Sequence, residues 1–201
     1  PVCQNSTSSF SFTVSNVKSG DNWTLTYQVD DAHTSSVTTT GKGPGTFTVA
    51  TPTLTDDKTY VVKFTNILNT TTGCDSSLSS DMNIVVDATT TSGSVASDTT
   101  VCYGAHVGTV THTGGNGSIV RWETSIDGGT SWSTITNTSG TYTYTNLTTT
   151  TLFRVVKMNG VCTEAATSPV TITVNALPVA SISGSDTVCA GESGSLTVTA
   201  T

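Results

Sequence analysis

The sequence predicts an all-β protein made of tandem sandwich modules, and three observations support this prediction. Charged residues make up 10% of the 201 residues, against about 25% in an ordinary globular domain. Threonine, serine and glycine take their place, and a β-branched residue such as threonine suits a pleated strand better than a helix. Short segments alternate apolar and polar residues, and no longer window carries the apolar period of a helix.

An internal repeat divides the chain. The dipeptide Val-Cys introduces three segments, and in the first two copies a tryptophan follows the cysteine at the same offset. The tripeptide Val-Val-Lys then precedes a second cysteine in both copies. The matching landmarks are Val2-Cys3, Trp23, Val61–Lys63 and Cys74 in the first copy, and Val101-Cys102, Trp122, Val155–Lys157 and Cys162 in the second. Chance is a poor explanation for matches that fall in one order.

These offsets predict three segments of the same kind. We expect one repeat over residues 1–88, a second over 89–176, and the truncated start of a third over 177–201. The first repeat lacks its leading strand, because Val-Cys comes much earlier there than in the other two. The linkers are short, which predicts modules stacked end to end and not flexibly tethered. We therefore expect this chain to be a segment of a longer repetitive protein.

The strands are clearest in the second repeat. Turn signals at 114–117, 127–129 and 159–160 separate short alternating segments, and Asp-Gly between such segments favours a hairpin. Strands at this spacing are typical of an immunoglobulin-like sandwich, in which Trp23 and Trp122 would be core residues of the third strand. The expected strands are 107–113, 118–126, 131–135, 142–147, 152–158 and 169–174 in the second repeat, and 10–14, 23–29, 46–49, 60–64 and 83–86 in the first.

Five cysteines in a charge-poor β chain indicate disulfides, and the odd count leaves Cys189 without a partner here. One connectivity closes each repeat, through Cys3–Cys74 and Cys102–Cys162. In such a sandwich, however, the two cysteines of a repeat lie at opposite ends of strands about 23 Å long, and a disulfide needs Cα atoms within about 7 Å. End-to-end stacking would instead favour Cys3–Cys162, with Cys74 and Cys102 bonded to other modules. The topology argument favours this second connectivity, and both stay open.

The second repeat resembles the immunoglobulin-like repeats of large cell-surface adhesins of Bacteroidota. The resemblance rests on the segments 122–132, 153–162 and 168–174, and on the third opening at 181–189. The closest known type is the SprB-like mobile adhesin of gliding flavobacteria. The resemblance covers nearly the whole chain, although the first repeat carries Asp30-Asp31-Ala-His in place of the Asp-Gly-Gly hairpin. Membership would imply export by the type IX system and display on the outer surface of a Gram-negative bacterium.

Composition and motifs argue against several functions. The net charge of −7 cannot neutralise a phosphate backbone, so we expect no nucleic-acid partner, and no apolar run is long enough for direct membrane insertion. His33, His106 and His112 lie outside any catalytic motif. We therefore expect a protein that is not an enzyme and has no resident cofactor.

Calcium is the one metal for which the sequence offers candidate ligands. Its candidate ligands are two acidic pairs, Asp30-Asp31 and Asp56-Asp57, because calcium binds several carboxylate oxygens. Solvated loop charge is the alternative interpretation. The cysteines are not expected to hold a metal, because no Cys-x-x-Cys spacing exists.

Two other features are candidate sites. Thr99 and Thr187 follow aspartates in short motifs that resemble the O-glycosylation acceptors of Bacteroidota, so we expect glycans there. Trp132 has no counterpart in the first repeat; it would either stack on a sugar ring or pack against the neighbouring hairpin.

The leading hypothesis is therefore a structural or adhesive repeat segment of a secreted surface filament that takes part in attachment and gliding motility. Its partners would be neighbouring repeats and a surface polysaccharide or substratum. The alternative is a carbohydrate-binding accessory module of a secreted polysaccharide-degrading enzyme, for which an exposed aromatic platform would be the mark.

Overall fold

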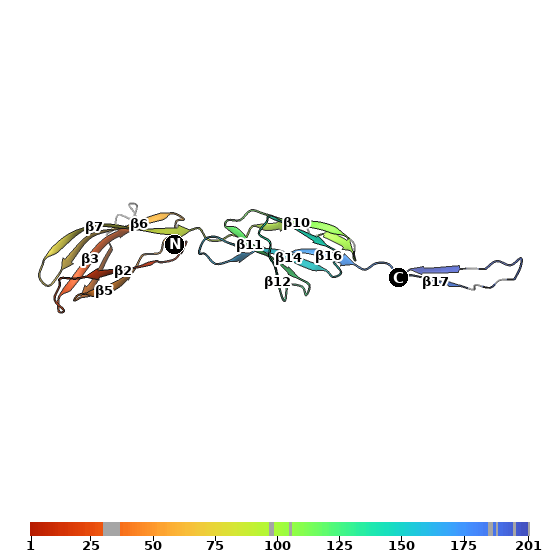
Figure 1. Cartoon of the computed structure of the whole chain (residues 1–201), viewed down its shortest axis with the longest axis horizontal. Helices are drawn as coiled ribbons and strands as arrows, with labels where there is room; N and C mark the ends of the chain where they lie inside the picture. Colours follow the sequence, from red (N-terminus) through yellow and green to blue (C-terminus); the bar gives the residue numbers. More distant parts are fainter. Residues whose placement is uncertain are drawn as a thin grey trace. The chain divides into compact units, whose positions relative to one another are not determined.

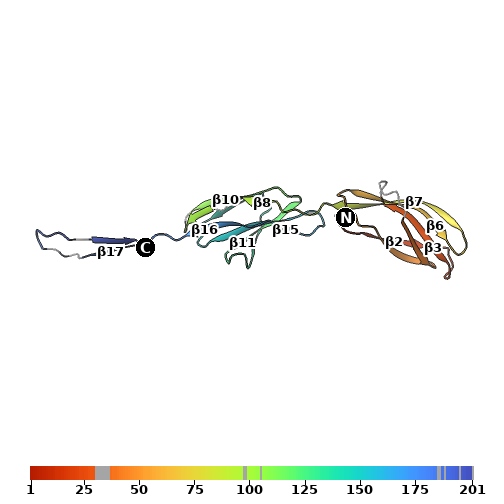
Figure 2. The ribbon, with the colours of Figure 1, turned by 180° about the vertical axis from the view of Figure 1, so that it is seen from behind.

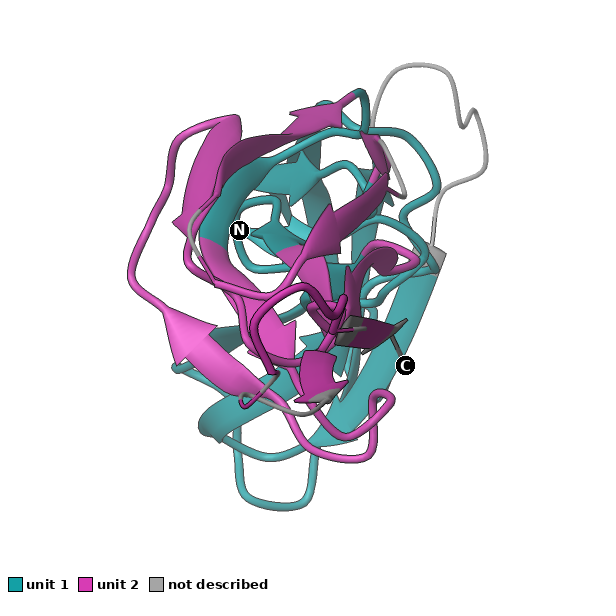
Figure 3. Ribbon diagram, turned by 90° about the vertical axis from the view of Figure 1, so that its right-hand side faces the viewer, with its two compact units in different colours: residues 1–92, 114–120, 156–166 teal, residues 93–113, 121–155, 167–201 magenta. Residues whose placement is uncertain are grey.

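The computed structural model describes residues 1–29, 37–96, 99–104, 106–184, 187, 189–194 and 196–200. These residues form strands and turns and contain no α-helix, so none of them belongs to a helix that could cross a membrane. The chain divides into two compact units (Figure 3). Unit 1 holds residues 1–92, 114–120 and 156–166, and unit 2 holds residues 93–113, 121–155 and 167–201.

The first repeat folds into two facing sheets. One sheet has the strand order β1-β7-β6-β3-β4, and the other consists of β2 and β5. Figures 1 and 2 show β3, β6 and β7 on one side of this sandwich and β2 and β5 on the other. The strands are β1 (Val2–Cys3), β2 (Ser9–Val14), β3 (Asn22–Val29), β4 (Val37–Lys42), β5 (Gly45–Ala50), β6 (Thr59–Asn69) and β7 (Asp75–Asp87).

The alternation of the strands explains this packing, because every second side chain points into the space between the sheets. In β3, Trp23, Leu25 and Tyr27 are each at most 2% exposed, and the threonines between them are only half-buried. Aromatic edges connect the two layers: Trp23 meets Phe47 with ring centroids 4.6 Å apart. The indole N–H of Trp23 donates to the carbonyl of Gly43 over 3.0 Å, which satisfies its only polar group.

The second repeat also forms two sheets, with the orders β13-β10-β8 and β12-β11-β14-β16-β9, and β15 pairs with β14. Its central tryptophan, Trp122, is fully buried and donates to the carbonyl of Ser139 over 2.9 Å. The strands are β8 (Ser94–Ala96), β9 (Thr99–Cys102), β10 (Val107–Thr113), β11 (Ser118–Ser125), β12 (Ser133–Ile135), β13 (Thr141–Thr145), β14 (Thr151–Met158), β15 (Ala165–Ala166) and β16 (Val170–Asn175).

The third segment contributes one antiparallel pair, β17 (Ala180–Gly184) with β18 (Leu196–Ala200). Ile182 and Val198 face each other across this pair, and both are well exposed. Two strands alone bury little apolar surface and are marginally stable.

The prediction of an all-β, immunoglobulin-like fold is confirmed, and so is the burial of Trp23 and Trp122. The strands differ from the expectation mainly where they are short or where they lengthen. Alternation did not indicate β1, β8, β9 or β15, because two to four residues are too few to show a period. It also missed the six-residue β4, whose sequence VTTTGK has no apolar alternation. Alternation also predicted too short a length for β6 and β7. Both strands extend beyond their apolar segments because they are hydrogen-bonded to each other there as an antiparallel pair.

Candidate functional site

The Val-Cys strand of each repeat runs parallel to the last strand of the same repeat. In the first repeat Val2 pairs with Val86 and Cys3 with Asp87. In the second repeat the register is the same, since Val101 pairs with Val174 and Cys102 with Asn175. The residue after each cysteine continues the ladder, and its N–H donates over 2.8 Å to the carbonyl opposite the cysteine. The pairing therefore places both cysteines at the end of the last strand.

Cys3 forms a disulfide with Cys162, whose Cα atom lies 4.9 Å away. The two cysteines are 159 positions apart and belong to different sequence repeats, yet both lie in unit 1. Cys162 follows a tight turn after β14 and is only 2% exposed. Its Sγ atom lies 3.4 Å from the carbonyl oxygen of Asp87 and 3.2 Å from that of Ala88.

The turn before Cys162 is fitted closely to Asp87. The N–H of Val161 donates to Oδ2 of Asp87 over 3.0 Å. Gly160 has a positive φ of 53°, and a Cβ atom there would lie 1.9 Å from Oδ2 of Asp87. Glycine meets both demands, since it adopts left-handed backbone at low cost and has no side chain to collide with the carboxylate.

Two asparagines hold the backbone that follows β7. Asn159 donates its side-chain amide to the carbonyl of Ala88 over 2.8 Å, and its N–H donates to Oγ1 of Thr90 over 3.0 Å. Asn116, in the turn between β10 and β11, donates to the carbonyl of Thr89 over 2.7 Å.

Asn116 also pairs with Thr91. It accepts from the hydroxyl of Thr91 over 2.8 Å and from its N–H, while its own N–H donates to Oγ1 of Thr91 over 2.8 Å. We call the set Cys3, Asp87–Thr91, Asn116 and Asn159–Cys162 the junction. Of this set, the sequence indicates only the cysteines and the Asn-Gly turn, because the other polar residues carry no motif.

The remaining cysteines that the structure describes, Cys74, Cys102 and Cys189, are free and exposed. The connectivity that closes each repeat, Cys3–Cys74 with Cys102–Cys162, is therefore not the one formed. The reason is the length of the strands. Within a repeat, the Val-Cys strand and the turn after β6 or β14 lie at opposite ends of the sandwich.

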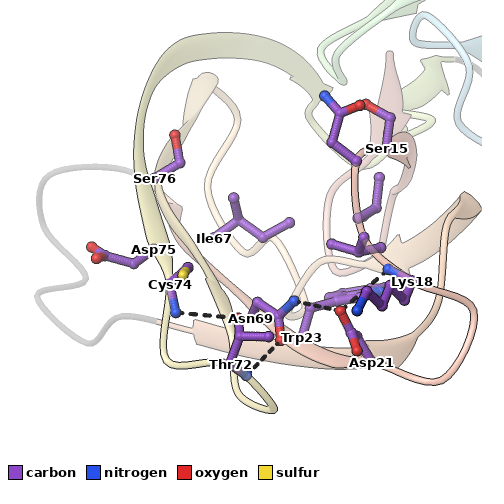
Figure 4. A pocket seen from close by; sticks show the side chains of 13 residues that line it. Ser15, Lys18, Asp21, Trp23, Ile67, Asn69, Thr72, Cys74, Asp75 and Ser76 are labelled. Carbon is purple, nitrogen blue, oxygen red and sulfur yellow. Dashed lines mark hydrogen bonds between the residues drawn. The ribbon is translucent and has the colours of Figure 1, made fainter.

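A cavity of about 550 Å³ adjoins Cys74, between the turn after β2 and the turn after β6 (Figure 4). Its wall includes Asn16, Lys18, Asp21, Trp23, Asn69 and Cys74. The side chain of Asn69 donates to Oδ2 of Asp21 over 2.9 Å, and the Lys18 N–H donates to the same oxygen over 3.2 Å. These two hydrogen bonds, the first above all, hold the pKa of Asp21 below its ordinary value.

A second cavity, of about 640 Å³, lies between β2 and β7 of the first repeat, with Phe12, Phe64, Leu78 and Met82 in its wall. In the second repeat β8 pairs with β10. In the described part of the first repeat β2 pairs with β5 alone. Nothing in the structure shows what covers this apolar wall.

Trp132 is half-buried, and one of its ring faces is covered. The guanidinium of Arg154 lies 3.8 Å from the ring centroid, and the indole N–H donates to the carbonyl of Gly129 over 3.0 Å. Arg154 in turn contacts Glu123 over 2.6 Å. Trp132 therefore packs against Arg154 of β14 and the turn at Gly129, and the ring face beneath Arg154 is closed to a sugar.

Two carboxyl groups near this hairpin have shifted pKa values. Burial raises the pKa of Glu123, but the hydrogen bonds and charges of Arg121 and Arg154 outweigh it and leave the pKa below its ordinary value. At the Asp127-Gly-Gly turn, hydrogen bonds from the hydroxyl and N–H of Ser131 and from the hydroxyl of Ser125 lower the pKa of Asp127 strongly. The carboxylate of Asp127 therefore closes the β11–β12 hairpin.

The metal and catalytic candidates are not brought together. Asp30, Asp31 and His33 lie outside the described residues. Asp56 contacts Lys58 over 3.5 Å, and Asp57 is exposed. His106 packs edge-on against Tyr144, and neither of its buried ring nitrogens has a hydrogen-bond partner. In the part of the chain that the structure describes, no three His, Cys, Asp or Glu residues are placed to hold a metal ion.

The two glycosylation candidates differ in their surroundings. Thr99 is exposed at the start of β9, where its backbone pairs with Ile172. Thr187 is exposed as well, and the residues on either side of it lie outside the described part of the chain. Glycosylation of either threonine stays a prediction.

Part of the chain matches a family model, and the chain as a whole is similar in fold to several solved structures. Residues 91–176 match the family model of a domain of unknown function, DUF8696, and no curated protein matches the chain. The fibronectin(III)-like modules of Clostridium thermocellum CbhA share 17% identity over 87% of this chain and 89% of theirs, with a TM-score of 0.39.

Two further solved structures are similar to this chain at low sequence identity. The N-terminal four Ig domains of Dscam1 isoform 4.44 share 13% identity over 87% of this chain and 42% of theirs, with a TM-score of 0.36. The FN1-FN3 domains of chicken CNTN1 share 13% identity over 90% of this chain and 71% of theirs, with a TM-score of 0.30. Similarities of this size concern the fold alone.

The fit between Gly160 and Asp87 can be tested by adding one methyl group. Gly160→Ala should destabilise the junction, because its Cβ would collide with the Asp87 carboxylate in addition to the cost of about 1–2 kcal/mol for left-handed backbone. Gly128→Ala is the matched control, since Gly128 also has a positive φ, 72°, with no atom within 4 Å of an added Cβ. Thermal unfolding and the rate of disulfide reduction by glutathione should both change more for Gly160→Ala. Equal effects of the two substitutions would contradict this account of the junction.

The Asp127 turn should depend on pH. The folded-state pKa lies below the unfolded value of about 3.9, so the carboxylate stabilises the folded state fully above that value and loses its contribution as pH falls through the folded pKa. Asp127→Ala should therefore unfold at a lower temperature than the parent at pH 7, and the two melting curves should converge in strong acid. A difference that persists unchanged at pH 1–2 would show that the charge is not responsible.

Proposed function

We propose that this chain is a load-bearing repeat segment of a large secreted surface adhesin, displayed outside a Gram-negative cell and used in attachment and gliding motility. The single observation that carries the proposal is the Cys3–Cys162 disulfide, which joins the Val-Cys strand of one repeat to the turn of the next. Disulfides persist in oxidising compartments such as the cell exterior. The resemblance of the second repeat to Bacteroidota adhesin repeats supplies the finer assignment.

The disulfide changes how the chain would respond to tension. Tension applied to the two ends of the chain passes from residue 3 to residue 162 through the sulfur–sulfur bond. The residues between them in the sequence therefore bear none of this tension. Unfolding of the first sandwich would then release no length. A stalk built from such repeats resists extension through covalent bonds, whereas one built from unlinked sandwiches depends on hydrogen-bonded strands.

The composition suits the same role. The chain is poor in charge, and the junction is built from amide, hydroxyl and backbone hydrogen bonds, with Asp87 as its single charged side chain. Salt weakens the attraction between exposed charges, over a Debye length of about 10 Å at 0.1 M. Contacts of this kind therefore lose little strength when the ionic strength outside the cell changes.

Single-molecule stretching tests the load-bearing part of the proposal. Cys3→Ser should add about 550 Å of extension, since 159 residue steps are released at roughly 3.3–3.6 Å each. The oxidised parent chain should show no event of that length. Cys102→Ser, which removes a free thiol, serves as the control and should behave as the parent does. Full extension of the oxidised parent would overturn the proposal that the disulfide bears load.

Antibody labelling tests the location and the role in movement. Fab fragments raised against this chain should label intact cells of the source bacterium and slow their movement over a surface. Fab fragments against an unrelated periplasmic protein are the control and should label only permeabilised cells. If the fragments against this chain also require permeabilisation, the proposed surface adhesin role is wrong.

A further inference from the structure

We infer that the Cys74 end of the first sandwich is a docking site for the Val-Cys end of another repeat, to which Cys74 becomes disulfide-bonded. We call this surface the Cys74 socket and define it by Asn16, Lys18, Asp21, Trp23, Asn69 and Cys74. The occupant is a repeat of this same kind, and Cys102 is the chain's own example of the cysteine that such a repeat offers. The inference rests on the Cys3–Cys162 junction and not on the adhesive role.

The first argument concerns the cysteine that is offered. Cys102 stands in the same register on its last strand as Cys3 does, opposite Asn175 as Cys3 stands opposite Asp87. The residue after each makes the same backbone hydrogen bond over 2.8 Å. Cys3 is bonded, whereas Cys102 is exposed and free. The same register position is thus occupied once by a disulfide-bonded cysteine, Cys3, and once by a free cysteine, Cys102.

The second argument concerns the cysteine that receives it. Cys74 follows β6 and Cys162 follows β14, each after a turn that contains a glycine with positive φ, Gly73 at 77° and Gly160 at 53°. Cys162 is 2% exposed, with the Asp87 and Ala88 carbonyls beside its sulfur. Cys74 is exposed and adjoins a cavity of about 550 Å³. The space that the end of a strand fills beside Cys162 is therefore open beside Cys74.

The third argument concerns Asn16. In the second repeat the turn between β10 and β11 provides Asn116, whose side chain holds the backbone at Thr89 and Thr91. The corresponding turn of the first repeat, between β2 and β3, provides Asn16, which is exposed in the wall of the cavity. Asn16 is held at a positive φ of 63°. The Cys74 socket thus has an asparagine amide, that of Asn16, in the turn that corresponds to the one from which Asn116 holds the backbone at the junction.

The bond forms by ordinary thiol–disulfide exchange. The two thiols together lose two protons and two electrons, and a disulfide oxidant such as oxidised glutathione takes them up and becomes two thiols. Nothing else is consumed. A tandem array would repeat the linkage at every junction, so that each repeat is bonded to the repeat before it and to the repeat after it.

Single-thiol versions of the full chain test the inference. One variant, Cys102→Ser with Cys189→Ser, keeps only Cys74 free; the other, Cys74→Ser with Cys189→Ser, keeps only Cys102 free. After equal amounts are mixed in a glutathione redox buffer, non-reducing electrophoresis and intact mass should show several-fold more Cys74–Cys102 heterodimer than the two homodimers together. Thiols that pair at random would give equal amounts of heterodimer and of summed homodimers, and that result would overturn the inference.

Two controls separate docking from thiol reactivity. A chain in which Asp57→Cys supplies the only free thiol should pair with the Cys102 chain at the random ratio, because Asp57 is exposed and lies outside the socket. Asn16→Ala in the Cys74 chain should reduce the heterodimer excess several-fold, whereas Asn83→Ala, an exposed asparagine on β7, should leave it unchanged. An excess that survives Asn16→Ala unchanged would contradict the role of the socket. Surface labelling of cells could fail while this excess is found, so the two proposals fall separately.

Discussion

The rest of the structure depends on a parallel pairing of only two residues, Val2 with Val86 and Cys3 with Asp87. Because it attaches the Val-Cys strand to the end of the last strand, it carries a sulfur to the edge of the sandwich and keeps it away from the cysteine of the same repeat. The identical register at Cys102 shows that this placement belongs to the repeat. Which cysteines can meet is therefore decided by strand pairing before any disulfide forms.

Around that sulfur, the chain joins its parts with small polar groups. Buried polar groups must be hydrogen-bonded to be tolerated, and here asparagine amides and threonine hydroxyls satisfy the backbone between β7 and β8. Gly160 allows the turn to approach Asp87 closely. A long charged side chain would lose more rotamer freedom on being fixed there, so a charge-poor composition suits a close junction.

The candidate sites that the structure describes are held in other contacts or lie apart. Trp132 lies beneath Arg154, whose carboxylate partner is Glu123, so the aromatic surface is part of the hairpin packing. The three histidines and the acidic pairs were weak candidates by sequence, and the described ones among them stay apart in space. The one disulfide among the described residues, Cys3–Cys162, lies at the junction in unit 1.

Alternation over five or more residues was enough to predict the β class, most strands, the buried tryptophans and the Asp127 hairpin, because each of these depends on neighbours along one strand or one turn. The repeat offsets likewise revealed the equivalence of Cys3 with Cys102 and of Cys74 with Cys162. Strand length raised the choice between two disulfide connectivities but left it open. Only the tertiary structure decided it, and it alone revealed Asn116, Asp87 and the cover that Arg154 places on Trp132. Such contacts join residues far apart in the chain, and no local period records which of them will meet.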